Sequence, residues 1–278
     1  KVFKAPIYFW VQDLWPESLK AAGGVKNIFV LGFFNSLTKW IYKHSKKILI
    51  QSNGFREYIL TQGIHNDKII FYPNPTEEFY KPLKEVNEYK EFFKSDFFNI
   101  VFAGNIGEAQ SFKTIIEAVN NIKELPVNVI VIGDGRYKKT ALNLIKEKGL
   151  ENHFNFLDSF PSTEMPKFFA HADGLLVSLK KNKIFSLTIP AKIQSYLACA
   201  KPIIASIDGI GAKIVTDANC GVVSPAENML VLSDRIKELM SLDKSKLYEM
   251  GMNSRTYYEK EFDRTYLLEK LEAILEDR

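Results

Sequence analysis

The fold class of this chain follows from one stretch of sequence, Asn99-Ile100-Val101-Phe102-Ala103-Gly104-Asn105-Ile106-Gly107. The stretch opens on an apolar run and turns at two glycines, and a helix-like segment follows over residues 112–123. A continuous apolar run indicates a strand that is covered on both faces. A buried strand, a glycine turn and a helix in this order predict the first unit of a parallel α/β domain.

The same alternation extends in both directions along the chain. Seven more short apolar runs lie at residues 7–11, 47–51, 68–72, 127–132, 154–157, 174–178 and 202–206. Among the helix-like segments, one has Asn53 as its candidate cap and stops at Gly63, one covers 137–148, and the last covers 264–276. Glycine just past a helix is a common end signal because it adopts a left-handed conformation at low cost. The whole pattern predicts an α/β, doubly wound fold.

Composition narrows the functional classes. Of the 278 residues, 37 are basic and 33 are acidic, and this balance argues against a nucleic-acid partner. No apolar run approaches the ~20 residues that a membrane span needs. The two cysteines, Cys199 and Cys220, lack metal-ligand spacing and fit a reducing compartment better than a disulfide scaffold. There is no paired-aspartate motif, so we expect no metal and no other cofactor.

Two places indicate how the chain is divided. Residues 73–82 contain three prolines, and the residues from there to 95 are charged and aperiodic, which predicts a linker between domains. The chain starts with Lys1-Val2-Phe3-Lys4 and soon enters an apolar strand. We interpret position 1 as a cut in a longer chain, which would leave the first domain incomplete.

Two glycine turns are candidates for contact with a phosphate group. They consist of Gly104, Asn105, Ile106 and Gly107, and of Gly133, Asp134 and Gly135. Both follow predicted strands, and in parallel α/β sheets ligands bind outside the carboxyl ends of the strands. The helix start after the first turn would add free N–H groups and a positive dipole end. The alternative is a tight turn of any α/β domain, and for Asp134 we favour a cap on the next helix.

A third candidate element spans residues 186–206. Pro190 suits the first turn of a helix, and Lys192 and Ser195 follow in the early turns, beside a dipole that favours anions. Lys192 is the best-placed cation for a phosphate. Lys201 lies nine residues further on, at the far end of the same helix, where we expect no phosphate contact.

Five segments in register resemble the GT4 family of glycosyltransferases. They are Asp13-Leu14-Trp15-Pro16-Glu17, Tyr72-Pro73-Asn74-Pro75, Ala103-Gly104-Asn105-Ile106-Gly107-Glu108-Ala109-Gln110, Ile132-Gly133-Asp134-Gly135 and Ile189-Pro190-Ala191-Lys192-Ile193-Gln194-Ser195-Tyr196-Leu197. Within the family, the chain most resembles WbuB-like enzymes assigned as L-fucosamine transferases of O-antigen synthesis. The resemblance implies a GT-B fold of two Rossmann-like domains. Residues 1–80 would end the acceptor-side domain, 81–255 would bind the nucleotide sugar, and 256–278 would cross back to the first domain.

The resemblance also implies an activity. It implies metal-independent sugar transfer with retention, from a nucleoside-diphosphate sugar that we expect to be UDP-linked, with an N-acetylated deoxyhexosamine as one candidate sugar. The acceptor would be a saccharide or a polyprenyl-diphosphate-linked saccharide in surface polysaccharide synthesis, such as that of O-antigen or capsule. The protein would act in the cytoplasm or at the inner face of the cytoplasmic membrane. The donor would contact both glycine turns, Gln110, Pro190, Lys192 and Ser195. Because the acceptor-side domain would be incomplete, we expect no turnover from this chain alone.

The sequence departs from the family pattern at charged positions. Many members carry two glutamates where this chain has Leu187 and Ser195, and Arg and Lys where it has Asn105 and approximately Gln110. A diphosphate would then depend on backbone N–H groups and on Lys192. Two other functions stay open. A UDP-sugar 2-epimerase on the same fold would need acidic and histidine groups for proton abstraction, and a nucleotide-binding remnant would need no catalytic group.

Further candidates lie outside the donor segments. Asp13, Trp15, Glu17 and Asn74 are candidates for lining the cleft, although Asp13 and Glu17 are better explained as caps of the helix after Pro16. The segment 33–47 mixes aromatic and basic residues. It suits contact with a membrane that carries a lipid-linked acceptor, and a packed surface helix explains it equally well.

Overall fold

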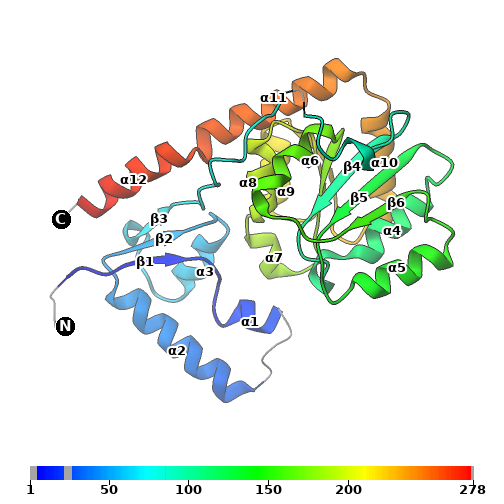
Figure 1. Cartoon of the computed structure of the whole chain (residues 1–278). Coiled ribbons are helices and arrows are strands. Elements are labelled where there is room, and N and C mark those ends of the chain that lie inside the picture. The colour runs from blue at the N-terminus through cyan, green and yellow to red at the C-terminus, as the bar shows by residue number, and fades with distance from the viewer. Residues whose placement is uncertain (1–4, 22–26, 85, 277–278) are drawn as a thin grey trace.

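The computed structural model describes residues 5–21, 27–84 and 86–276, and it contains two parallel sheets (Figure 1). Residues 1–4, on which the interpretation of a cut rests, lie outside the described part. The small sheet has the order β1-β2-β3, formed by β1 (Tyr8–Val11), β2 (Lys47–Ile50) and β3 (Ile69–Phe71). Its two strand pairs are parallel, as the continuous apolar runs predicted.

Helices cover both faces of the small sheet. On one face, α2 (Ile28–His44) and α3 (Phe55–Thr61) pack against Ile48 and Ile50. On the other face, α12 (Arg264–Glu276) packs against Leu49, and Tyr72 donates its hydroxyl to the Leu267 carbonyl at 3.0 Å. A short helix, α1 (Glu17–Ala21), and a 3₁₀ turn at Asn66–Lys68 complete this lobe. The C-terminal helix therefore belongs to the core of the N-terminal lobe.

The start of α3 differs from the expectation. Asn53 does not cap the helix, because Gly54 occupies the N-cap position and no side chain caps it from there. The side chain at this helix start is instead that of Ser52, whose hydroxyl accepts a hydrogen bond from the Gly54 amide at 3.2 Å. The same hydroxyl donates to the Leu187 carbonyl of the other lobe at 2.5 Å. This start of a helix is thus also a contact between the lobes.

The large sheet is doubly wound, and all five of its strand pairs are parallel. Its order is β6-β5-β4-β7-β8-β9. The strands are β4 (Phe98–Ala103), β5 (Val127–Ile132), β6 (Phe154–Leu157), β7 (Gly174–Ser178), β8 (Ile203–Ser206) and β9 (Gly221–Ser224). The strand β9 was not predicted. The chain first adds strands on one side of β4 and then on the other, so the order reverses between β4 and β7.

Two hydrophobic layers bury the two faces of this sheet. Val101 and Ala103 face one layer, and Ile100 and Phe102 face the other, which explains why β4 reads as a continuous apolar run. The first layer is covered by α6 (Met165–His171), α8 (Ala191–Ala198), α9 (Ile210–Asp217) and α11 (Lys244–Glu261). The second layer is covered by α4 (Phe112–Asn120), α5 (Lys138–Glu147) and α10 (Met229–Met240). The short helix α7 (Lys183–Leu187) lies beside α1 and α9.

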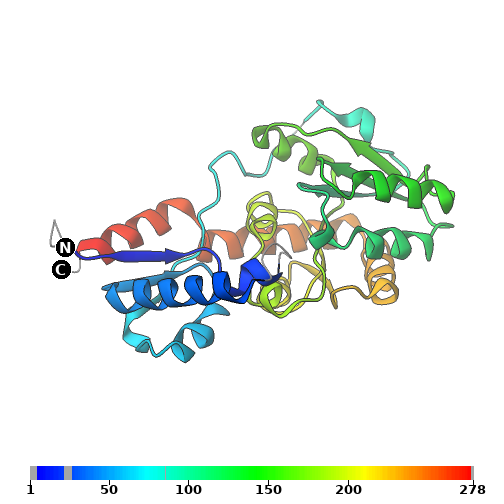
Figure 2. The ribbon, with the colours of Figure 1, turned by 90° about the horizontal axis from the view of Figure 1, so that it is seen from below.

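The chain passes between the lobes twice (Figures 1 and 2). The first passage is the segment from Tyr72 to residue 97, whose regular structure is a 3₁₀ turn at Lys90–Phe92. The second lies at Phe262 and Asp263, between α11 on the large lobe and α12 on the small one. The domain boundaries at residues 80 and 255 stay predictions.

Candidate functional site

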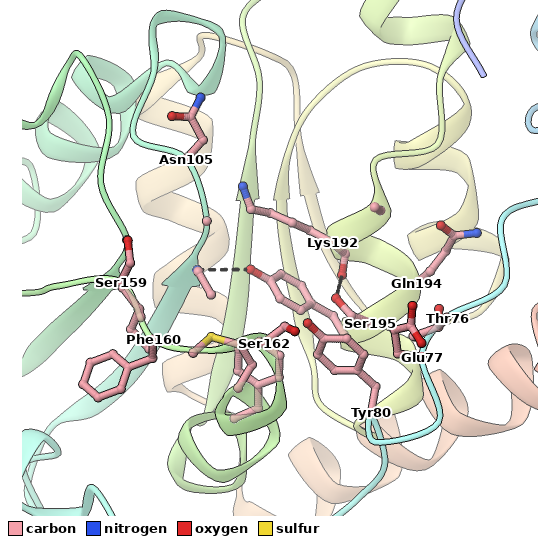
Figure 3. A pocket seen from close by; sticks show the side chains of 18 of the residues that line it. Thr76, Glu77, Tyr80, Asn105, Ser159, Phe160, Ser162, Lys192, Gln194 and Ser195 are labelled. Carbon is pink, nitrogen blue, oxygen red and sulfur yellow. Dashed lines mark hydrogen bonds between the residues drawn. The ribbon is translucent and has the colours of Figure 1, made fainter.

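A cavity of about 600 Å³ lies at the carboxyl edge of the large sheet (Figure 3). It opens where the strand order reverses between β4 and β7, which is the place where parallel α/β sheets bind ligands. The start of α8 and the connecting segment from Asn74 to Tyr80 form one side, and Asn105 of the first glycine turn and the loop with Ser159 and Phe160 form the other. Its volume lies within the range of about 300–1,000 Å³ that is usual for small-molecule sites.

Both glycine turns reach the cavity, and they pack tightly against each other. Gly104, Asn105, Gly133 and Asp134 line the cavity. A Cβ added to Gly133, whose φ is +138°, would lie 2.2 Å from the Gly104 carbonyl oxygen. A Cβ added to Gly135 would lie 2.3 Å from the Ile106 carbonyl oxygen. The glycines of the second turn are therefore explained by the close approach of the two turns.

The helix after the first turn does not face this cavity, contrary to the expectation. Gly107 donates its amide to the Gln110 side chain at 3.1 Å, and a 3₁₀ turn at Glu108–Gln110 follows. The helix α4 begins only at Phe112, and its start lines a different hollow of about 470 Å³. Gln110 thus acts as a local cap. Ile106 is fully buried, and Ile106, Gly107, Gln110 and Gly135 are absent from the cavity walls.

Lys192 projects from the first turn of α8 toward the first glycine turn. Pro190 is the N-cap of this helix and does not itself line the cavity. The Lys192 ammonium lies 4.2 Å from the centroid of the Phe102 ring, and a Cβ on Gly104 would come within 2.8 Å of Lys192 Cε. Burial lowers the pKa of this ammonium to about 8. Within the part of the chain that the structure describes, it has no hydrogen-bonding or ion-pair partner.

The next residues of α8 connect the cavity to the segment between the lobes. Gln194 is buried and donates its amide to the Asn74 carbonyl at 2.8 Å. Ser195 lines the cavity and donates its hydroxyl to the Lys192 carbonyl at 3.0 Å. Asn74, predicted for the cleft, therefore lies in the same cavity as the donor candidates of α8.

Asp134 has a different role from the predicted helix cap. Its carboxylate accepts a hydrogen bond from the Gly135 amide at 2.8 Å, within the turn. The helix α5 begins four residues later at Lys138, and no side chain caps it at Tyr137. Asp134 lines the cavity while it orders its own turn.

A sequence model of the family described as glycosyl transferases group 1 matches residues 84–257. This range covers the whole large sheet and the helices on both of its faces. The chain belongs to the glycosyl transferases group 1 family. The match includes both glycine turns and α8, so these cavity walls lie in the part of the chain that defines the family.

Individual relatives agree with this assignment. The chain is 24% identical over 173 residues to WcaI of Escherichia coli (strain K12), a protein assigned as a colanic acid biosynthesis glycosyl transferase; the match covers 61% of this chain and 40% of that protein. It is 24% identical over 223 residues to the uncharacterized glycosyltransferase MJ1178 of Methanocaldococcus jannaschii, a match that covers 80% of this chain and 57% of that protein. The chain thus spans about half the length of the curated relatives that it matches.

A solved structure supports the fold of this member of the family. Alr3699/HepE of Anabaena, whose crystal structure is described as a complex with UDP and glucose, superposes with a TM-score of 0.81 at 15% identity. The match covers 100% of this chain and 73% of that one. At this identity the likeness shows the fold alone, and the UDP and glucose are ligands of HepE. The finer resemblance to WbuB-like enzymes stays a prediction.

Several residues that line the cavity were not predicted from the sequence. They come from the connecting segment, the loop after β6 and α6, and include Thr76, Glu77, Tyr80, Ser159, Phe160, Ser162, Met165 and Phe169. The loop after β6 follows the carboxyl end of a strand, so the rule used for the two glycine turns would also have selected it. The connecting segment has no such signal, because its position over the cavity depends on the tertiary fold.

Three cleft candidates lie away from this cavity. Asp13 and Trp15 line a separate hollow of about 330 Å³ between β1 and α2. Glu17 lines a groove beside α2 and α3, and it lies in the first turn of α1, where an acidic side chain stabilises the helix dipole. Of the four candidates, the structure therefore places only Asn74 with the donor candidates.

Metal-ligand clusters, cysteine thiols and apolar helices are the remaining features that bear on function. Over the described ranges, no group of three or more His, Cys, Asp or Glu residues could hold a metal ion. Cys199 and Cys220 are buried free thiols, and burial raises the pKa of both. Of the helices in those ranges, none has the combined length and apolarity that crossing a membrane requires.

Proposed function

We propose that the cavity binds a nucleoside-diphosphate sugar, with UDP as the carrier, and that the protein transfers this sugar with retention. The acceptor would be a saccharide or a lipid-linked saccharide of a surface polysaccharide. The observation that carries the proposal is the unpaired Lys192 ammonium beside Gly104, in a cavity at the switch point of the sheet. Family membership supports the reaction class, and the cavity supports the donor.

The diphosphate would contact the Lys192 ammonium at the place where it lies against the first glycine turn. A partly buried cation without a counter-ion is unfavourable, and a bound anion would remove that penalty. Gly104 has no side chain, and this leaves the space in which the end of the Lys192 side chain lies against the turn. The positive end of the α8 dipole adds to the same field. In the transfer step the leaving nucleoside diphosphate gains negative charge, and these fixed groups would stabilise it without reorganisation.

The ribose would lie toward the connecting segment. Glu77 and Asp134 are the two carboxylates among the described residues that line the cavity; Asp134 is engaged within its turn, and Glu77 has one oxygen 3.6 Å from the Arg264 guanidinium. In Figure 3, Glu77 lies beside Ser195, the position at which many relatives carry a glutamate. A carboxylate accepts hydrogen bonds from two neighbouring hydroxyls, which suits a ribose diol. We propose that Glu77 supplies from the connecting segment the acid that α8 lacks.

The choice of carrier and acceptor rests on relatives. The structure of HepE is described as a complex with UDP and glucose, which favours uridine as the base. WcaI is named for the biosynthesis of colanic acid, which favours a polysaccharide product. Retention and a metal-independent reaction are carried over from the GT4 resemblance, and the cytoplasmic location follows the same proposal. The sugar proposed is an N-acetylated deoxyhexosamine, as in the WbuB-like enzymes.

The other functions are less well supported by the cavity. A 2-epimerase needs groups that remove and return a proton. Of the described residues that line the cavity, none is a histidine, and its two carboxylates come from different segments, Glu77 from the connecting segment and Asp134 from the turn after β5. A nucleotide-binding remnant would share the donor site and would differ only in turnover.

Calorimetric titration of the 278-residue chain with UDP, GDP, ADP and CMP tests the proposal. We expect UDP to bind most tightly and Lys192→Ala to weaken that binding. Equal binding of all four nucleotides, or no binding of any, would contradict the donor site. Retention is tested separately by the anomeric configuration of any product formed from a UDP-sugar. Because we expect no turnover from this chain alone, the nucleotide titration carries the test of the donor site.

A further inference from the structure

The large sheet opens into a gap at the place where its strand order reverses. The last residues at which β4 and β7 pair are Val101 and Leu175. On their outer sides, β4 pairs with β5 as far as Ala103, and β7 pairs with β8 as far as Ser178. The pairing of β4 with β7 thus stops before either strand ends. We call the gap that follows the sheet split.

The hydroxyl of Tyr196 lies in the sheet split. It accepts a hydrogen bond from the Ala103 amide at 3.4 Å and donates one to the Leu176 carbonyl at 3.2 Å. Both groups lie just beyond the last paired residues, so the hydroxyl stands where the next backbone hydrogen bond of the ladder would form. Burial raises the pKa of this hydroxyl, which therefore keeps the proton that it donates. Two hydrogen bonds in series hold the strands further apart than one direct bond would.

The Lys192 side chain crosses the same edge of the sheet. Lys192 precedes Tyr196 by four residues on α8, so the two side chains leave the helix on the same face. Helix α8 packs in the first hydrophobic layer, whereas the Phe102 ring next to the Lys192 ammonium belongs to the second. The side chain passes from one layer to the other against Gly104, the residue that follows β4 (Figure 3).

We propose that Tyr196 is a positioning residue of the donor site, whose hydroxyl keeps β4 and β7 apart so that the Lys192 ammonium reaches the first glycine turn. Closing the split by one more backbone hydrogen bond would move Ala103, and with it the glycine turn, relative to the Lys192 side chain that packs against it. The inference deepens the proposed function and rests on it, since Lys192 is taken to bind the diphosphate. Tyr196 would act on the ligand through Lys192 and the turn.

A buried tyrosine can also serve stability alone, and Tyr72 provides the comparison. Its hydroxyl donates to a backbone carbonyl, that of Leu267 at 3.0 Å, and both tyrosines have 1% of their surface exposed. Tyr72 packs in the core of the small lobe and does not line the donor cavity. Tyr72→Phe therefore measures the cost of losing a buried phenol hydroxyl away from the sheet split.

Calorimetric titration of the 278-residue chain with UDP and with uridine tests the inference. The variants are Tyr196→Phe, Lys192→Ala, both changes together, and Tyr72→Phe as the matched control. We expect Tyr196→Phe to weaken UDP binding by about tenfold and to leave uridine binding unchanged, since the ring stays in place and the cation shifts. The double variant should bind UDP no more weakly than Lys192→Ala, because a residue that acts through another has no effect once that residue is removed. Tyr72→Phe should bind UDP like the parent.

The titration of Lys192 gives a second readout, which needs no nucleotide. In Tyr196→Phe the ammonium should leave its buried position, so its pKa should rise from about 8 toward 10.5. Nuclear magnetic resonance of ¹³C-labelled lysine follows this change in the free protein. In the titrations with UDP, the affinity of the variant should begin to fall at a higher pH than that of the parent. Tyr72→Phe should leave the pKa of Lys192 at its value in the parent.

Unchanged UDP affinity in Tyr196→Phe, together with a loss in Lys192→Ala, would overturn the inference and leave the donor site in place. Additive losses in the double variant would assign Tyr196 to stability and would also overturn the inference. If the parent binds no UDP but the pKa of Lys192 rises in Tyr196→Phe alone, the donor proposal fails and the positioning role stands.

Urea midpoints of Tyr196→Phe and Tyr72→Phe show whether both variants are folded during the titrations. If Tyr196→Phe does not fold, replacement of Tyr196 by 4-aminophenylalanine keeps a donor at the same place. This variant should be folded and should bind UDP more tightly than Lys192→Ala does. A folded 4-aminophenylalanine variant that binds UDP no better than Lys192→Ala would contradict the positioning role.

Discussion

The Lys192 ammonium lies over the face of Phe102, 4.2 Å from the ring centroid. The ring is the last large side chain of β4 before Ala103 and Gly104, so the strand that leads into the glycine turn also holds the cation beside it. A cation over an aromatic face is stabilised by roughly 0.5–2 kcal/mol, much less than by a bound diphosphate. The contact therefore positions Lys192 without satisfying its charge.

We expect Lys192→Ala to weaken UDP binding by about tenfold to a hundredfold, which corresponds to the ~1.5–3 kcal/mol of a charge-assisted contact. Uridine has no phosphate, so its binding should hardly change, and calorimetry of both ligands separates the two effects. Lys201 is unsuitable as a control, because it is half-buried and donates to the carbonyls of Ala170 and Ala172. The exposed Lys181 is a better one, and Lys181→Ala should bind UDP like the parent. Equal losses of affinity for UDP and for uridine in Lys192→Ala would show that Lys192 acts on folding.

The low pKa of Lys192 predicts a pH dependence of UDP binding. In the free protein the ammonium loses its proton as the pH rises through about 8, whereas a bound diphosphate would stabilise the charged form. Affinity should then fall by up to about tenfold per pH unit above 8. Lys192→Arg should bind equally well across this range, since arginine stays charged. A flat profile for the parent protein would contradict the assignment of Lys192 to the diphosphate.

Stability should follow the opposite trend in the absence of a ligand. The folded-state pKa of Lys192 lies below the ordinary value of 10.5, so the unfolded chain binds more protons between the two values. The contribution of this residue to the free energy of unfolding should therefore rise between pH 8 and 10.5. Urea titrations of the parent and Lys192→Met, compared at several pH values, isolate that contribution.

Gly133→Ala should destabilise the protein more than Gly149→Ala. Both glycines have positive φ, +138° and +65°, but only at Gly133 would a Cβ clash with another backbone atom, the Gly104 carbonyl. Strain alone costs about 1–2 kcal/mol for a left-handed residue, and the clash adds to it by forcing the two glycine turns apart. Urea midpoints measure the difference, and UDP affinity should fall only for Gly133→Ala. Equal urea midpoints for the two variants would mean that the two glycine turns can separate at little cost in free energy.

Glu77→Gln should reduce the preference for ribose over deoxyribose. We expect this variant to bind UDP about tenfold more weakly while its binding of 2′-deoxy-UDP changes little, since the lost acceptor serves the diol. Glu78→Gln is the matched control, because Glu78 lies 3.7 Å from Arg264, as Glu77 does at 3.6 Å, but Glu78 does not line the cavity. A similar loss in both variants would assign the effect to the net charge of the connecting segment.

Nucleotide binding should not need a metal ion. Lys192 and the α8 dipole supply positive charge at the place where a divalent ion would otherwise be expected. UDP affinity measured with EDTA and then with Mg²⁺ or Mn²⁺ should agree within a few-fold. A gain of tenfold or more with metal, about 1.4 kcal/mol, would count against this site.

The sequence was sufficient to predict the strands that pair along the interior of both sheets. Runs such as 99–103 and 127–132 are apolar on both strand faces apart from one asparagine each, and burial on both faces explains that pattern. The edge strand β9 was missed, because it starts at Gly221, ends at Ser224 and has only two apolar side chains between them. Gly221 is explained only by the tertiary structure, where a Cβ would clash with the Ile203 carbonyl of β8.

The site was predictable only where it follows from strand ends. Gly104, Gly133 and Lys192 come together because parallel strands present their carboxyl ends at one edge. Gln110 was assigned to the ligand because the sequence does not reveal that a 3₁₀ turn would intervene before α4 and use this side chain as a cap. Glu77 and Tyr80 were missed because their approach to the cavity depends on long-range contacts such as that of Gln194 with Asn74.

The helix α12 gives the two lobes a second attachment, through Leu267 in the core of the small lobe and the short break at Phe262 and Asp263. A body held at one point can tilt and twist in every direction, whereas a body held at two separate points rotates freely only about the line that joins them. Widening or narrowing the donor cavity by lobe movement would thus require the backbone to bend near Asn74 and near Asp263 together. The last residues of the chain, far from the cavity in sequence, restrict the direction in which it can open.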